Sequence, residues 1–228
     1  MFISEKKYKL TDETTKHKGR VLRRIEALKD FAGVKMGDKG GFIKSESNLS
    51  HEGNCWVFND AKVCGDAIVC GDSIVCDDAI VYSNAIVCGN ARIYNNAKIG
   101  GNAKVCGNAK VSNNAEIFGN AFVYGNADIY DNALVYGYAL VYDNAQIYGN
   151  AEICGHAIIA NNFDYIVFES WWDCSRFFTW TKSNNMWYVG WFYGTRKELI
   201  EKAYNNSELS GREYERVVKY VESTIKAE

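Results

Sequence analysis

The chain has 228 residues, of which 47% are hydrophobic and 24% charged, and its formal net charge is −2 at pH 7. This balance is typical of a globular protein and argues against a nucleic-acid partner, although residues 1–44 carry twelve Lys and Arg against six acidic residues. No apolar run of about eighteen residues occurs, and the stretch MFISEKKYKL lacks the apolar core of a secretory signal, so we expect no membrane partner and a cytoplasmic location.

Residues 1–52 precede a repeat and are interpreted as its N-terminal cap. A solenoid has an unpaired coil at each end, and that coil must be closed. Ile43 and Leu49 fall in the register that holds Ala in the repeat. Bulky side chains in place of Ala are what a closing first coil requires.

Residues 53–160 follow a six-residue pattern. From Val57 to Ile159 every sixth residue is Ile or Val, eighteen times without an insertion, and the residue two positions earlier is Ala except at Cys55 and Ser73. Two residues at this spacing share one face of a strand. The intervening Gly-Asn pair tolerates the positive φ that a tight corner needs. A fixed six-residue period therefore predicts a parallel β-helix.

The phrase Gly-Asn-Ala-x-Ile/Val-Tyr/Cys resembles the hexapeptide-repeat family of left-handed parallel β-helices. This resemblance implies a mainly β fold of about six triangular coils, with three repeats in each, and a homo-oligomer, with a trimer favoured. The stretches KYKLTDE, VLRRIEALKDFAGVKMGDKGGFIKSESNLSHEGNCWVF and YVGWFYGTRKEL also resemble uncharacterised hexapeptide-repeat proteins of bacteriophages and prophages. That second resemblance implies a viral or prophage setting and no established activity.

Because three repeats form one coil, every third repeat lies on the same outer face of the prism, and the outward residues can be assigned to three faces. The faces through Val57 and Val63 mix charged and apolar residues, whereas the face through Val69 has a single charge, that of Lys104. We define the outward residues of this last face as the apolar face: Ile68, Cys70, Ile86, Cys88, Lys104, Cys106, Phe122, Tyr124, Leu140, Tyr142, Ile158 and Ala160. Monomers rarely expose such a surface. We expect its members other than Lys104 and Ala160 to form an oligomer interface, or to be covered by a terminal segment.

Residues 161–228 are predicted to form a small, aromatic-rich α+β domain. DYIVFESWW, RFFTWTK and MWYVGWFYG are typical of three strands, and capping boxes at Thr195–Glu198 and Ser210–Glu213 predict two helices. Exposed Trp and Arg residues are common anchors of protein contacts, although strand alternation should bury about half of these aromatic side chains. The candidate partner-binding residues are Trp171, Trp172, Arg176, Trp180, Trp187 and Trp191.

No catalytic, metal or cofactor site is predicted. His156 is the only histidine within the repeat, and it occupies a corner one coil after Tyr138, so the two rings should stack. The loops that hold acyl donors in the family's transferases are absent, and one histidine cannot supply the three-histidine zinc site of the family's anhydrases. No CxxC motif occurs, and most cysteines follow the repeat, so they are interpreted as free thiols that serve as small apolar residues.

The sequence thus favours a non-catalytic, oligomeric interaction protein that binds an unidentified host protein, with components of host defence among the candidates. Two alternatives stay open. One is the sequestration of a small molecule or nucleotide between subunits, and the other is a hexapeptide acyltransferase.

Overall fold

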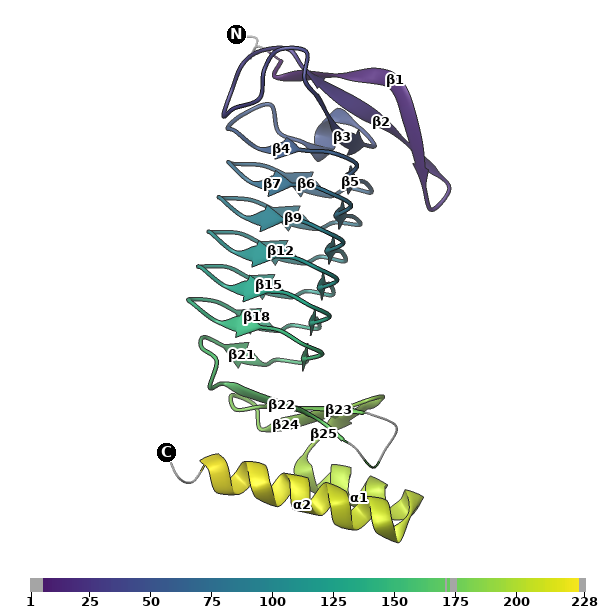
Figure 1. The fold of residues 1–228 in the computed structure, drawn as a ribbon, viewed down its shortest axis with the longest axis vertical. Helices are drawn as coiled ribbons and strands as arrows, with labels where there is room; N and C mark the ends of the chain where they lie inside the picture. The colour runs from purple at the N-terminus through teal and green to yellow at the C-terminus, as the bar shows by residue number, and fades with distance from the viewer. Residues whose placement is uncertain (1–5, 171, 173–175, 226–228) are drawn as a thin grey trace.

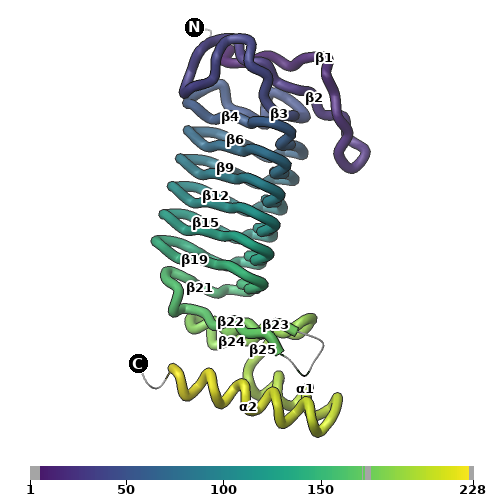
Figure 2. The backbone as a smooth tube through the Cα atoms, viewed as in Figure 1, coloured from purple at the N-terminus to yellow at the C-terminus, as the bar shows by residue number. Residues whose placement is uncertain are grey.

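The computed structural model describes residues 6–170, 172 and 176–225. Figure 1 shows a long β-solenoid with an N-terminal cap at one end and an antiparallel sheet with two helices at the other. The tube in Figure 2 shows the coils stacked along one axis, with the two chain ends at opposite ends of the molecule. Within the described ranges, no helix is both long and apolar enough to cross a membrane.

Two-residue strands stack into three parallel sheets, which we name by their first inward residue. The Val57 sheet contains β4 (Trp56–Val57), β7 (Ile74–Val75), β10 (Arg92–Ile93), β13 (Lys110–Val111), β16 (Asp128–Ile129) and β19 (Gln146–Ile147). The Val69 sheet contains β6 (Ile68–Val69), β9 (Ile86–Val87), β12 (Lys104–Val105), β15 (Phe122–Val123), β18 (Leu140–Val141) and β21 (Ile158–Ile159). The Val63 sheet contains β5 (Lys62–Val63), β8 (Ile80–Val81), β11 (Lys98–Ile99), β14 (Glu116–Ile117), β17 (Leu134–Val135) and β20 (Glu152–Ile153).

The inside of the prism is filled by the Ala and Ile/Val rows of the repeat, as the sequence predicts. From Ala61 to Ile159 the residues of both rows are at most 1% exposed. Strands pair in register with the strand eighteen residues later, as in Ile93 with Val111. In successive coils Ala therefore lies on Ala, and Ile or Val lies on Ile or Val. This arrangement packs the interior of the prism closely without large side chains.

The backbone hydrogen bonds give the solenoid a direction. Outside the bonds that join two strand residues, the N–H groups of each coil donate to carbonyls of the coil that follows it in the chain, as from Ile86 N to Ala103 O (2.9 Å). The corresponding carbonyls at the first coil and N–H groups at the last coil therefore lack a neighbouring coil. Buried backbone groups need partners, so these groups require donors at the N-terminal end and acceptors at the C-terminal end.

The N-terminal cap supplies donors from the side chains of Lys7 and Tyr8. Lys7 is buried, and its Nζ donates to Gly53 O (3.2 Å) and Cys55 O (2.8 Å). Tyr8 is also buried, and its Oη donates to Leu49 O (2.7 Å). The carbonyls of Leu49, Gly53 and Cys55 at this end are thereby satisfied.

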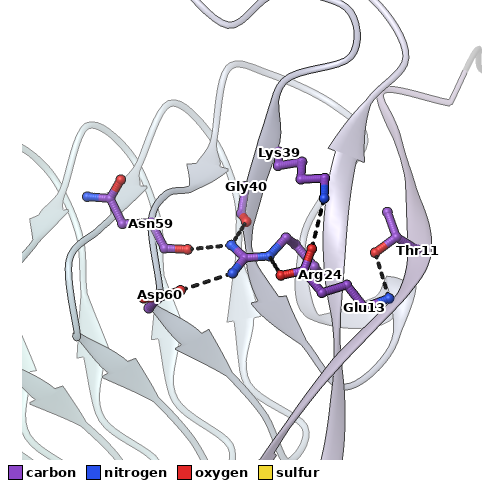
Figure 3. Close-up of polar contacts among 7 residues, drawn as sticks. All are labelled: Thr11, Glu13, Arg24, Lys39, Gly40, Asn59 and Asp60. Atoms are coloured by element: carbon purple, nitrogen blue, oxygen red, sulfur yellow. Dashed lines mark hydrogen bonds and ion pairs between the residues drawn. The ribbon is translucent and has the colours of Figure 1, made fainter.

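A third donor is Arg24, which Figure 3 shows between the cap and the first coil. The cap is a hairpin of β1 (Tyr8–His17) and β2 (Arg20–Ala27), continued by β3 (Lys39–Ile43) and a 3₁₀ turn (Glu46–Asn48). The Arg24 guanidinium donates to Gly40 O (2.8 Å) and Asn59 O (3.0 Å), and it pairs with Asp60 (3.0 Å). Part of the positive charge near the N-terminus thus closes the solenoid.

The register predicted for Ile43 and Leu49 is wrong. Ile43 pairs with Val63 and Leu49 with Val69, so both lie in the aliphatic rows rather than the Ala rows. The reason is that the corner from Leu49 to Trp56 is two residues longer than the later corners, which shifts everything before it. The cap contributes an additional turn, and the solenoid has about seven turns instead of six.

The C-terminal unit is α+β, as predicted, but its sheet has four strands. They are β22 (Tyr165–Glu169), β23 (Phe177–Thr181), β24 (Met186–Val189) and β25 (Phe192–Gly194), followed by α1 (Arg196–Asn206) and α2 (Glu208–Ile225). The stretch expected to be one strand is a hairpin, because Gly190 adopts positive φ (58°) at its centre.

The two predicted helix starts have different outcomes. The capping box of α1 at Thr195 and Glu198 is confirmed. The start predicted for α2 at Ser210 is three residues late, because Ser207 Oγ accepts the hydrogen bond from Ser210 N (3.0 Å).

The C-terminal unit supplies the acceptors that the last coil needs. Thr179 Oγ1 accepts from Glu152 N (3.1 Å), and Ser183 Oγ accepts from Ile158 N (2.7 Å). Both ends of the solenoid are therefore closed by side chains of the polarity that the backbone direction requires.

Candidate functional site

The apolar face forms the outer surface of the Val69 sheet. Ile68, Phe122 and Ile158 keep 41%, 37% and 44% of their area exposed, and the other apolar members are half-buried by their neighbours in the row. The Tyr124 and Tyr142 rings stack with centroids 5.3 Å apart. The face is thus a flat, ordered, apolar surface that the described parts of the chain leave open to solvent.

Three cysteines form a row on this face. Burial raises the pKa of the Cys70, Cys88 and Cys106 thiols, to about 11 for Cys88, and their neighbours in the row add to the effect at Cys70 and Cys88. Such thiols are protonated at neutral pH and make poor nucleophiles. The row acts as apolar filling, in agreement with the sequence analysis.

The Val63 sheet differs, because other parts of the chain pack on it. Near the cap, Leu22 of the hairpin packs with Cys64 and Tyr82. At the far end, the ring of Tyr188 in β24 lies 6.2 Å from that of Tyr136. The β1–β2 hairpin, which could have covered the apolar face, therefore lies on a different sheet.

Glycine is common in the corners that border the apolar face. Their first residue, which has positive φ, is mostly glycine, with Ser83 and Asp143 as the exceptions: Gly65, Gly71, Gly89, Gly101, Gly107, Gly119, Gly125, Gly137 and Gly155. At the opposite corner the same position holds Asn59, Asp77, Asn95, Asn113 and Asp131, with φ between 53° and 60°, and then Gly149 with φ 65°. Side chains in this conformation cost energy relative to glycine. The second residue of the corners that border the apolar face is mostly an exposed Asn, and these side chains form hydrogen-bonded ladders such as Asn84–Asn102–Asn120 along its edges.

His156 does not form a catalytic arrangement. Its ring is exposed and stacks on Tyr138, with centroids 5.0 Å apart and planes at 8°, which confirms the predicted contact. In the described part of the chain no side chain hydrogen-bonds its ring nitrogens, so nothing orients it as a general base. Nor does any group of three or more His, Cys, Asp or Glu residues there have the arrangement of a metal site.

The candidate partner-binding residues have different environments. Trp180 and Trp187 are only 4% and 1% exposed and pack in the core of the C-terminal unit, so their assignment as contact residues was wrong. Trp172 is half-buried against Phe178, and Trp171 lies outside the described residues. Trp191, by contrast, is 99% exposed at the turn between β24 and β25.

A cleft of about 140 Å³ lies beside Trp191. It is lined by Trp191 and Phe192, by Leu199 and Lys202 of α1, and by Arg176. The Lys202 Nζ lies 5.4 Å from the centre of the Phe192 ring. Sequence reasoning identified Trp191 and Arg176 but missed Phe192 and Lys202, although Lys202 follows the predicted apolar residue Leu199 by one helical turn.

Comparison with known proteins supports the repeat architecture. A family model described as the YdcK β-solenoid repeat matches residues 129–143. The uncharacterized acetyltransferase YdcK of Escherichia coli (strain K12) is 37% identical over an alignment of 67 residues, which covers 25% of this chain and 20% of that protein. The chain thus matches about a fifth of that relative's length.

Proposed function

We propose that this hexapeptide-repeat β-helix protein is a non-catalytic scaffold that self-associates through its apolar face and presents its C-terminal unit to a partner protein. The observation that carries the proposal is the apolar face itself. It has one charge among twelve outward positions, keeps Ile68, Phe122 and Ile158 exposed, and has glycine at most of the positive-φ positions in its bordering corners. Exposed apolar surfaces of this extent mark interaction sites.

A trimer is the assembly we favour, as in the family that the repeat resembles. The partner is proposed to be a host protein and the setting a phage or prophage, on the strength of the resemblance of the cap and the C-terminal stretch. A cytoplasmic location is part of the same proposal. It is supported by seven described cysteines that are all free, as is usual in a reducing compartment.

The test places two charges on the apolar face. The double variant Ile86→Glu with Leu140→Glu should be monomeric in sedimentation or light-scattering measurements while the wild type is an oligomer, because a buried unpaired carboxylate is costly. Ile80→Glu with Leu134→Glu is the matched control, since it makes the same changes at half-buried positions of the Val63 sheet. A folded Ile86/Leu140 variant with the mass of the wild type would rule out the proposed interface.

An acyltransferase is the second candidate, and the partial match to a protein named as an acetyltransferase is what favours it. His156 would have to be its base. Turnover of acetyl coenzyme A that is lost in His156→Ala would replace our proposal with this one. Sequestration of a small molecule between subunits is the third candidate, and a native mass above a whole-number oligomer by several hundred daltons would favour it.

A further inference from the structure

We propose that the cleft beside Trp191 binds a peptide segment of a partner protein in which one large apolar side chain is flanked by carboxylates. This inference rests on the proposed presentation of the C-terminal unit and adds to it the chemistry of the ligand. It is independent of self-association, because the apolar face lies on the Val69 sheet and the cleft lies in the C-terminal unit.

The size of the cleft fits one side chain. A space of about 140 Å³ is close to the roughly 150 Å³ that an apolar cavity needs to take up a benzene ring. Leu199 and Ala203 of α1 form an apolar floor that is itself buried, and Phe192 forms a wall. A whole small-molecule ligand of drug size would need several hundred Å³. The apolar group that enters is therefore a Phe, Leu or Met side chain carried on a chain that remains outside.

The charge around the cleft selects the flanking residues. Arg176 and Lys202 both line it, and none of its lining residues in the described chain is acidic. Lys202 is exposed and makes no ion pair with the described residues, although it lies over the Phe192 ring. A carboxylate beside the inserted side chain would meet this ammonium group at a partly desolvated edge, where charge pairing contributes more than in open water. Basic flanking residues would be repelled.

Trp191 supplies the contact area for the segment outside the cleft. A tryptophan that is 99% exposed contributes nothing to the packing of its own domain. It is held at a tight turn, where Gly190 has positive φ and β24 pairs with β25 through Val189 and Phe192. The backbone of Trp191 is thereby held next to the cleft. Trp, Tyr and Arg are enriched among the residues that dominate binding energies at protein interfaces.

The test measures binding of labelled peptides to the full chain by fluorescence anisotropy. The probe is a seven-residue peptide with a central Phe between three acidic residues on each side. Two comparison peptides replace the Phe by Ser or the acidic residues by Lys. We expect the wild type to bind the first peptide in a salt-sensitive manner, since ionic screening acts over about 10 Å at 0.1 M. The two comparison peptides should bind at least about tenfold more weakly.

Matched variants locate the site. Trp191→Ala and Lys202→Glu should each weaken binding about tenfold. Tyr220→Ala changes another exposed aromatic residue, and Lys197→Glu changes another exposed cation of α1. Neither lines the cleft, so both should stay within about twofold of the wild type. Thermal unfolding of all four variants checks that they remain folded.

Several results would overturn the inference. They are equal binding of the Lys-flanked peptide, no saturable binding of the acidic peptide, and equal binding by the Trp191 and Lys202 variants. If Trp191→Ala instead lowers the oligomer mass, the cleft is filled by a second copy and the peptide assignment is wrong. A failure here with an intact apolar-face interface would leave self-association standing, because the Ile86/Leu140 variant tests that separately.

Discussion

Replacing Tyr8 by Phe is the sharpest test of how the solenoid is closed. Tyr8 is fully buried, and its Oη donates to Leu49 O at 2.7 Å. Burial, with a contribution from Glu46, raises the pKa of this phenol, so it remains a donor across the accessible pH range. Phenylalanine keeps the ring, which stacks on His51 at 4.3 Å, and removes only the hydroxyl.

The expected cost follows from the carbonyl that is left behind. No other group among the described residues donates to Leu49 O, so Tyr8→Phe leaves a buried acceptor without a partner. Such an acceptor costs about 1–3 kcal/mol. Because solenoid stability is approximately a sum over neighbouring coils, the loss should appear at the first coil. Each 1.4 kcal/mol is tenfold in an equilibrium, so local opening should increase about 5- to 150-fold.

Hydrogen exchange resolved along the chain measures this effect. Amides of the first coil, such as those of Lys44 and Ser50, should exchange faster in Tyr8→Phe, whereas amides of the middle coils should be unchanged. Tyr138→Phe is the control, because Tyr138 is largely exposed and should lose less than about 0.5 kcal/mol. If Tyr8→Phe exchanges like the wild type throughout, the idea that donor side chains close the N-terminal end is refuted.

Two further predictions concern the interior of the fold. Burial raises the pKa of the Glu152 carboxyl, so its contribution to stability is complete below its unfolded pKa and is lost as pH rises through the folded pKa. Relative to the wild type, Glu152→Gln should therefore become increasingly stable above about pH 4.3. Parallel pH profiles of the two proteins in urea unfolding would contradict this. At Gly107 a Cβ would lie 2.8 Å from Gly125 N, whereas at Gly149, which has a similar φ, it would meet nothing. Gly107→Ala and Gly149→Ala should each lose about 1–2 kcal/mol of stability, because Ala disfavours the left-handed backbone. Gly107→Ala should lose more than this because its Cβ meets the next coil. Equal losses of stability in calorimetry would show that the coils can separate at Gly107.

The repeat predicted the prism well because each of its positions has one physical role. The Ile/Val and Ala rows can only face inward, and glycine or asparagine can only form the corners, so strand positions and the buried rows followed from the pattern. Left-handed winding remains a prediction from the repeat. The register of Ile43 and Leu49 did not follow, because the two extra residues before Trp56 carry no signal of where the corner widens.

The candidate site was predictable only in part. The apolar face could be listed in advance, since the period assigns every outward residue to a sheet. The aromatic strands offered a weaker guide. RFFTWTK alternates Phe178 and Trp180 with Thr179 and Thr181, but both faces of MWYVGWFYG are apolar, so alternation cannot identify its buried side. The burial of Trp180 and Trp187 and the exposure of Trp191 are decided by α1 and α2, which cover one face of the sheet.

The central claim, that another copy of the chain covers the apolar face, is tested most directly by thiol alkylation of the native protein with peptide-resolved mass spectrometry. Cys88 on this face and Cys76 on the Val57 sheet are both half-buried, and burial raises the pKa of each thiol to about 11. A lone chain should therefore label the two at similar rates. Our account predicts that Cys70, Cys88 and Cys106 label much more slowly than Cys76, and that the difference disappears in the Ile86→Glu, Leu140→Glu variant. Equal labelling of Cys88 and Cys76 in the wild type would mean that the apolar face is open to solvent and that the proposed interface does not exist.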